Sequence, residues 1–268
     1  MRPSSRWCLG LAILAVAAIP EHAALADTPV DLELVLAVDV SGSMDLDEQA
    51  LQRQGYIAAI LQPDVLAAIR SGPFQRVAIT YVEWAGPSAH GVAVPWTLIE
   101  DATSAAAFAA ALDDAPPARM RGTSISGALL FAAPLFEGNG FEGMRRVIDV
   151  SGDGPNNAGG PVVPARDLAL QQGIVINGLP IALKGGGSWS LGGADLVAYY
   201  RDCVIGGPGA FVVPVTAVDQ FADAIRQKLI LEIAGGAPHA LPAAARPVAD
   251  TADCLLGERL RRIWERDP

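Results

Sequence analysis

The feature that most constrains the fold is an apolar run, DLELVLAVD, at residues 31–39. Polar and apolar residues alternate at the start of the run, and the rest is continuously apolar. This pattern is typical of a strand buried on both faces of a sheet. Such a strand needs helices above and below it, and segments with helical spacing do alternate with the later apolar runs. The sequence therefore predicts an α/β fold, a doubly wound and mostly parallel sheet.

The expected sheet has six strands. They are predicted at residues 31–39, 76–85, 92–99, 146–151, 174–181 and 211–215. A short loop at Gly86 and Pro87 joins the second strand to the third, so these two should pair antiparallel. Helices are predicted at residues 45–62, 102–112, 124–136, 164–172, 194–203, 218–233 and 253–265. The first helix should turn these side chains inward: Leu51, Ile57, Ile60 and Leu61.

The first 26 residues have the features of a secretory signal peptide. Arg2 and Arg6 precede an apolar run at residues 7–19, and Ala24 and Ala26 supply small residues before the expected cleavage point. The run is shorter than the roughly 20 residues of a spanning helix, so a membrane anchor is the weaker interpretation. We therefore expect the mature protein to be periplasmic or secreted.

The rest of the chain divides into three parts. They are a domain at 27–235, an Ala- and Pro-rich linker at 236–250 and a C-terminal helix at 251–268. The formal net charge is −10, which argues against nucleic acid as a partner because phosphate binding needs a basic surface. No further apolar stretch is long enough to span a membrane. The sequence leaves the oligomeric state open.

Two cysteines, Cys203 and Cys254, follow the signal peptide, which contains Cys8. In an oxidising compartment we expect them to form one disulfide; two separate buried thiols are the alternative. The bond would pin the C-terminal helix, which is rich in arginine. A basic helix should be drawn to an acidic domain, although a helix that faces a partner or a lipid surface is also possible.

Oxygen-bearing side chains follow two strands and precede one helix. Asp39, Ser41 and Ser43 come directly after the first strand, Thr123 begins the helix at 124–136, and Asp153 follows the fourth strand. In a parallel sheet these positions gather at one edge, so the side chains can converge. Hydroxyls with two carboxylates suit a hard cation such as Mg²⁺, with Mn²⁺ or Ca²⁺ as alternatives. No His or Cys lies near them in the sequence to suit a softer metal.

This ordered set resembles the metal-ion-dependent adhesion site (MIDAS) of the von Willebrand factor type A (VWA) family. The family pattern is Asp-x-Ser-x-Ser after the first strand, a distant Thr, and Asp-Gly after the fourth strand. The DVSGS at 39–43, Thr123 and Asp153-Gly154 match all three parts, and the resemblance covers residues 31–235. Through INGLPI at 176–181 and GGPGAF at 206–211, the chain is also similar to an exported bacterial branch with a domain of unknown function.

The resemblance implies a Rossmann-like fold with one antiparallel edge strand. It also implies a protein-binding module rather than an enzyme, in which the metal accepts an exposed carboxylate from a partner protein. The metal ligands implied here are Asp39, Ser41, Ser43, Thr123 and Asp153.

Two other functions stay open. A Mg²⁺-dependent hydrolase, such as a phosphoesterase, needs a nucleophile or activated water and cationic groups at the site. His90 and His239 lie in no motif that places them there, and the glycine-rich loop at Lys184 lacks the order of a phosphate-binding loop. We therefore do not expect an enzyme. The second alternative is a structural envelope protein in which a metal only stabilises the fold.

Overall fold

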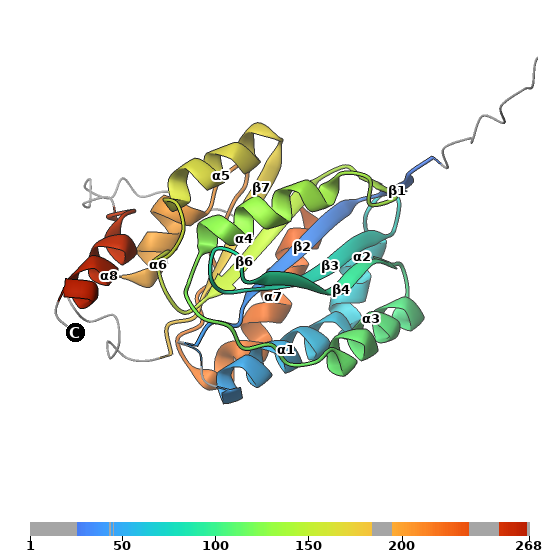
Figure 1. Cartoon of the computed structure of the whole chain (residues 1–268). Coiled ribbons are helices and arrows are strands. Elements are labelled where there is room, and N and C mark those ends of the chain that lie inside the picture. The colour runs from blue at the N-terminus through green and yellow to red at the C-terminus, as the bar shows by residue number, and fades with distance from the viewer. Residues whose placement is uncertain (1–25, 43, 45, 184–194, 236–251, 267–268) are drawn as a thin grey trace, which may run out of the picture.

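A computed structural model of the chain describes residues 26–42, 44, 46–183, 195–235 and 252–266. A five-stranded sheet lies between two layers of helices (Figure 1). Its strand order is β4-β3-β2-β6-β7. The strands are β2 (Leu32–Asp39), β3 (Val77–Trp84), β4 (His90–Ile99), β6 (Arg146–Gly152) and β7 (Ile174–Pro180). All neighbouring pairs are parallel except β3 and β4, which are antiparallel as predicted.

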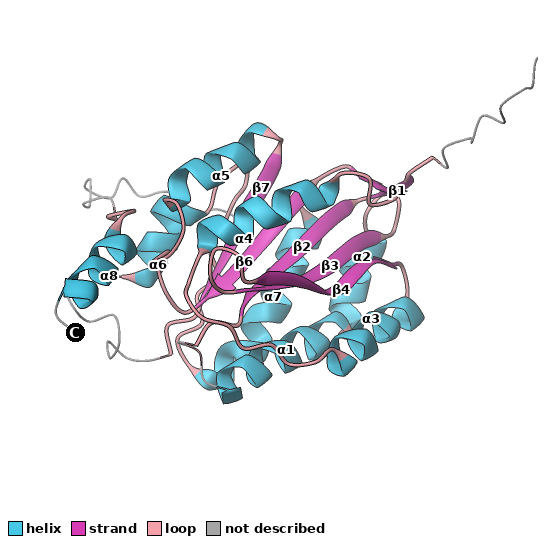
Figure 2. Ribbon diagram, viewed as in Figure 1, coloured by secondary structure: helices cyan, strands magenta, loops and turns pink. Residues whose placement is uncertain are grey.

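One layer of helices covers each face of the sheet, as Figure 2 shows. The first layer contains α1 (Leu46–Ile60), α2 (Pro63–Arg70), α3 (Ala102–Asp114) and α7 (Phe221–Ala234). The second contains α4 (Ile125–Ala132) with the 3₁₀ turn η1 (Ala133–Phe136), α5 (Val162–Gln171), α6 (Leu196–Tyr199) and the π-helical turn η2 (Tyr200–Val204). A 3₁₀ turn, η3 (Val218–Gln220), leads into α7, and α8 (Leu256–Arg266) is the last element that the structure describes.

The central strand β2 is buried along its whole length. Side chains of a strand alternate between faces, so Leu34 and Leu36 contact the α1–α3–α7 layer while Val35 and Ala37 contact the α4–α5 layer. Burial on both faces explains why this segment reads as continuously apolar in the sequence.

The strand order reverses beside β2, which has β3 on one side and β6 on the other. In open α/β sheets, ligands bind at such a switch point, beyond the carboxyl ends of the strands. Asp39 is the last residue of β2, and Asp153 directly follows β6. The fold therefore places both predicted carboxylates at the edge where a ligand site is expected.

The predicted sixth strand at 211–215 is wrong as a regular strand. The segment runs beside β7 and shares backbone hydrogen bonds with it through Phe211, Val213 and Val215, but the pairing is two separate bridges and not a continuous ladder. Pro214 has no backbone N–H to donate, and the N–H of Phe211 donates to the side chain of Asn177 instead of a backbone carbonyl. The sheet therefore has five strands, with this segment laid along its edge.

Other boundaries also differ from the prediction. The helix expected at 45–62 ends at Ile60, and a separate helix, α2, begins at Pro63, because a proline disfavours helical geometry in the residue before it. A short parallel pair, β1 (Thr28–Val30) with β5 (Phe141–Gly143), was not predicted.

Some predicted segments lie outside the described residues: the signal peptide up to residue 25, the linker at 236–250 and the loop at Lys184. Within the described part of the chain, every helix is too short or too polar to cross a membrane.

Candidate functional site

Three loops meet at the end of the sheet where the parallel strands have their carboxyl ends, and each loop carries predicted ligands. The loop after β2 is joined to the loop before α4 by a bridge between Ser41 and Met120. The loop after β6 is joined to the same α4 loop, because the carbonyl of Thr123 accepts hydrogen bonds from the backbone N–H groups of Asn157 and Ala158, at 2.8 and 3.1 Å. Segments more than a hundred residues apart are thus held in one place.

Asp39 is fully buried at the centre of this end of the sheet. Its Oδ1 accepts a hydrogen bond from the backbone N–H of Ser41 at 2.7 Å. Its Oδ2 is buried as well, and no described residue donates a hydrogen bond to it. Burial, and then the negative charge of Asp153, raise the pKa of Asp39 well above its ordinary value. A buried carboxylate oxygen without a donor is costly, and a bound cation would satisfy it.

Thr123 is also buried, and the loop after β6 holds it on both sides. Its backbone N–H donates to Oδ1 of Asn157 at 3.1 Å, while its carbonyl accepts from the N–H of Asn157. The next residue, Ser124, begins α4 as its N-cap, because its hydroxyl accepts from the N–H of Gly127 at 3.1 Å. Ser124 therefore caps a helix, whereas the position of Thr123 depends on Asn157 in another loop.

Tyr200 is a residue of this site that the sequence did not reveal. A Cβ atom at Gly152 would lie 2.9 Å from the hydroxyl of Tyr200 and 2.9 Å from Oδ2 of Asp39, so both oxygens face the same point. The hydroxyl is buried without a hydrogen-bond partner among the described residues. Burial, and then the charges of Asp39 and Asp153, raise the pKa of Tyr200. The residue lies in the π-helical turn η2, a local geometry that is frequent at functional sites but has no sequence signal.

The predicted ligands differ in how far the structure describes them. Asp39, Ser41 and Thr123 are buried at this end of the sheet, and Asp153 is half-buried beside them. Ser43 lies outside the described residues. Among the described residues there is no group of three or more His, Cys, Asp or Glu side chains arranged for a metal. The possible metal ligands in the described part of the site are therefore hydroxyl oxygens and two carboxylates.

His90 does not reach this site through any contact that the structure records. Its ring stacks on Phe131, with the ring centroids 4.1 Å apart, and it begins the edge strand β4. This placement agrees with a structural histidine. His239 lies outside the described residues.

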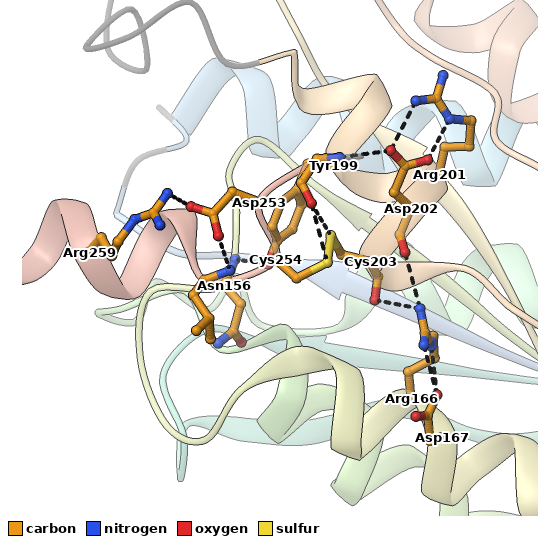
Figure 3. The surroundings of a disulfide bond; sticks show 12 residues. Asn156, Arg166, Asp167, Tyr199, Arg201, Asp202, Cys203, Asp253, Cys254 and Arg259 are labelled. Atoms are coloured by element: carbon orange, nitrogen blue, oxygen red, sulfur yellow. Dashed lines mark hydrogen bonds and ion pairs between the residues drawn. A yellow bond between two sulfur atoms is a disulfide. The ribbon is translucent and has the colours of Figure 1, made fainter. Parts of the chain in front are cut away.

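The C-terminal helix packs against the loop after β6, where Glu258 contacts Asn156, and Figure 3 shows the disulfide beside this contact. Cys203 and Cys254 form a disulfide, which confirms the predicted bond and agrees with an oxidising compartment. The backbone N–H of Ala252 donates to Asp202 at 3.0 Å, and Leu260 of α8 is buried. The tail helix therefore docks on its own domain, as expected.

Solved structures confirm the VWA-like fold. A proximal thread matrix protein from the mussel byssus is 14% identical, with a TM-score of 0.55 over 78% of this chain and 49% of that chain. The pilus adhesin SpaC of Lactobacillus rhamnosus GG is 15% identical, with a TM-score of 0.53 over 77% of this chain and 30% of that chain. A von Willebrand factor type A protein from Catenulispora acidiphila is 16% identical, with a TM-score of 0.51 over 76% and 43%.

The match covers half or less of the length of these three structures, and at such identities it shows the fold alone. No curated protein matches the sequence. A family model does: residues 29–237 match the family described as "Protein of unknown function (DUF1194)". Because the match spans most of the sequence and nearly all of the folded domain, this chain belongs to the DUF1194 family, and its fold is that of a VWA domain.

Proposed function

We propose that this protein is a metal-dependent protein-binding module that captures an acidic group of a partner through a MIDAS. The observation that carries the proposal is Oδ2 of Asp39, a buried carboxylate oxygen without a donor among the described residues, next to a second carboxylate, Asp153. Two acidic groups this close favour a cation between them. The ligands would be Asp39, Ser41, Ser43, Thr123 and Asp153, with Mg²⁺ as the best match to an all-oxygen set and Mn²⁺ or Ca²⁺ as alternatives.

A bound divalent cation would supply an electrophilic point that attracts a carboxylate. The chain's own residues do the rest: Asp39 is held by Ser41, and Thr123 is held by Asn157. Another structure of the mussel thread protein is described as having a zinc-occupied MIDAS motif, and SpaC is described as an adhesin. The first supports a metal at this motif and the second supports a binding role for a domain of this fold, and neither identifies the partner here.

Titration calorimetry with Mg²⁺ and Mn²⁺ tests the metal site. Wild type should bind one ion, Asp39→Ala should bind none, and Thr123→Ala should bind more weakly because a hydroxyl ligand is lost. Equal affinity in wild type and Asp39→Ala would contradict the site. Circular dichroism of each variant shows whether the fold persists.

Capture experiments separate a binder from an enzyme or a scaffold. Proteins recovered on the immobilised mature domain in Mg²⁺ should be released by EDTA and absent from the Thr123→Ala column. A partner that stays bound in excess EDTA would argue against the MIDAS mechanism. Release of phosphate from a phosphoester substrate, lost in Asp39→Ala, would instead favour a hydrolase.

A further inference from the structure

We infer that the C-terminal helix α8 supports metal binding, because it holds the loop after β6 in place. That loop carries Asp153, and its residue Asn157 orients Thr123. This inference rests on the metal site proposed above. The helix lies beyond residues 29–237, so membership of the family does not account for it. Two of its hydrogen bonds to the domain are made to neighbouring residues, Asn156 and Asn157.

The first contact is between α8 and Asn156, a fully buried residue three positions after Asp153. The amide nitrogen of Asn156 donates to Oε1 of Glu258 at 2.7 Å and to the carbonyl of Gly160 at 3.0 Å. Its Oδ1 accepts from the N–H of Ser126 at 2.9 Å, so the same side chain ties α8 to the first turn of α4. Glu258 therefore fixes a residue that connects two of the three loops of the site.

The second contact is a close approach of backbones. A Cβ atom on Gly257 would overlap the carbonyl oxygen of Asn156, so α8 lies directly on the loop at this point. On the next turn, Arg261 donates to the carbonyl of Asn157 at 3.4 Å. Because Asn157 binds both backbone groups of Thr123, the position of a candidate metal ligand depends on a loop that α8 covers.

The disulfide gives α8 a second connection to the site. Cys203 lies in the π-helical turn that begins with Tyr200, whose hydroxyl faces Oδ2 of Asp39 across Gly152. The adjacent residue, Tyr199, accepts a hydrogen bond from the N–H of Asn156 at 3.2 Å (Figure 3). The Cys203–Cys254 bond thus joins the segment that carries Tyr199 and Tyr200 to the helix that carries Glu258, and Asn156 lies between them. Metal affinity should therefore respond to the redox state of the bond.

The experiment measures Mg²⁺ and Mn²⁺ affinity of the full mature chain by calorimetry. Glu258→Ala should lower the affinity by up to about 10-fold, the lower end of the loss caused by removing a direct outer-shell partner, because Glu258 acts on the ligands through Asn156. Glu258→Gln should retain it, because the amide oxygen still accepts the hydrogen bond from Asn156. Arg262→Ala, an exposed position on the same helix, is the matched control and should bind as wild type does.

Two further variants test the backbone contact and the tether. Gly257→Ala forces α8 away from Asn156, and Cys254→Ser removes the disulfide; both should weaken metal binding. Hydrogen exchange without metal provides a second measurement, in which the amides of Thr123 and Asn157 should exchange faster in Glu258→Ala while those of β3 are unchanged.

The outcomes separate this inference from the proposed function. If wild type binds metal and Glu258→Ala, Gly257→Ala and Cys254→Ser bind it equally well, α8 is only a docked tail and the inference is overturned. Equal loss in Glu258→Ala and Glu258→Gln would also overturn the hydrogen-bond argument. If wild type itself binds neither Mg²⁺ nor Mn²⁺, both proposals fail.

Discussion

Asn157 and Thr123 form a reciprocal pair across 34 positions of sequence. The side chain of Asn157 accepts from the N–H of Thr123 at 3.1 Å, and the N–H of Asn157 donates to the carbonyl of Thr123 at 2.8 Å. One half of the pair depends on the asparagine side chain and the other on the backbone alone. Thr123 is therefore oriented by a residue that makes no direct contribution of its own to the predicted ligand set.

Asn157→Ala should lower Mg²⁺ affinity by about 10- to 100-fold, because it removes a group that orients a ligand. Titration calorimetry measures the change. Asn139→Ala is a suitable control: its amide also holds a distant segment, through Glu33, but beside the short β1–β5 pair rather than beside the site. The prediction would be wrong if both asparagine variants changed the affinity to the same extent.

Gly152→Ala should abolish metal binding. The new methyl group would lie 2.9 Å from both Oδ2 of Asp39 and the hydroxyl of Tyr200, closer than real Cβ contacts. Gly160→Ala is the matched control, since a Cβ atom there meets nothing within 4 Å. Calorimetry measures metal binding by the Gly152→Ala and Gly160→Ala variants. Unchanged binding in Gly152→Ala would show that the metal lies elsewhere.

Glu232 should make stability fall as pH rises toward neutrality. It is buried with Lys228, Asp149 and Asn177, and burial, followed by the charge of Asp149, raises its pKa to about 7. The folded protein therefore holds a proton that the unfolded chain releases near its ordinary pKa. The stabilisation is complete below about pH 4.5 and disappears as pH rises through about 7, an effect on the order of 3 kcal/mol.

Urea unfolding at several pH values between 5 and 8 measures this effect. Glu232→Gln cannot ionise, so its unfolding free energy should show a shallower decrease over the same range. Parallel pH profiles for wild type and the variant would mean that Glu232 titrates normally in the folded protein.

The Cys203–Cys254 bond should contribute about 4 kcal/mol to global stability, because it closes a loop of 51 residues in the unfolded chain. Urea unfolding of the oxidised protein and of the Cys203→Ser, Cys254→Ser double variant gives the difference. A difference close to zero would mean that α8 unfolds independently and that the bond restrains only the tail.

The sequence predicted the order of elements well because the strongest signals were local. The continuously apolar β2 and the β3–β4 hairpin are confirmed. The disulfide is confirmed as well, although it joins residues 51 positions apart, because the sequence has just two cysteines after the predicted signal peptide. The inward face of α1 was partly wrong: Leu51 and Leu61 are exposed. Gln52 is buried instead, because its amide donates to the hydroxyl of Ser151 at 2.7 Å. Periodicity cannot reveal a polar residue whose burial depends on a partner 99 positions away.

In the candidate site, too, residues in local motifs were predicted and residues brought in by tertiary packing were not. Asp39, Ser41, Thr123 and Asp153 stand in recognisable motifs, and their assignment as ligands stays a prediction. Tyr200 and Glu258 could not be found in this way, since each approaches the site through tertiary packing of a segment without a motif. Ligand-bearing turns leave a pattern in the chain, whereas the groups that surround them depend on how distant segments dock.

The two edges of the sheet limit how a partner protein can bind. β4 carries Pro95 and departs from regular pairing with β3 between Ile79 and Val82, while β7 is covered by the irregular segment at 211–215. Prolines, bulges and covering loops are features that prevent a sheet from extending into another molecule. Recognition by strand addition is therefore disfavoured at both sides. If the proposed metal site captures a partner, the partner would have to approach the loops at the carboxyl ends of the strands, without adding a strand to the sheet.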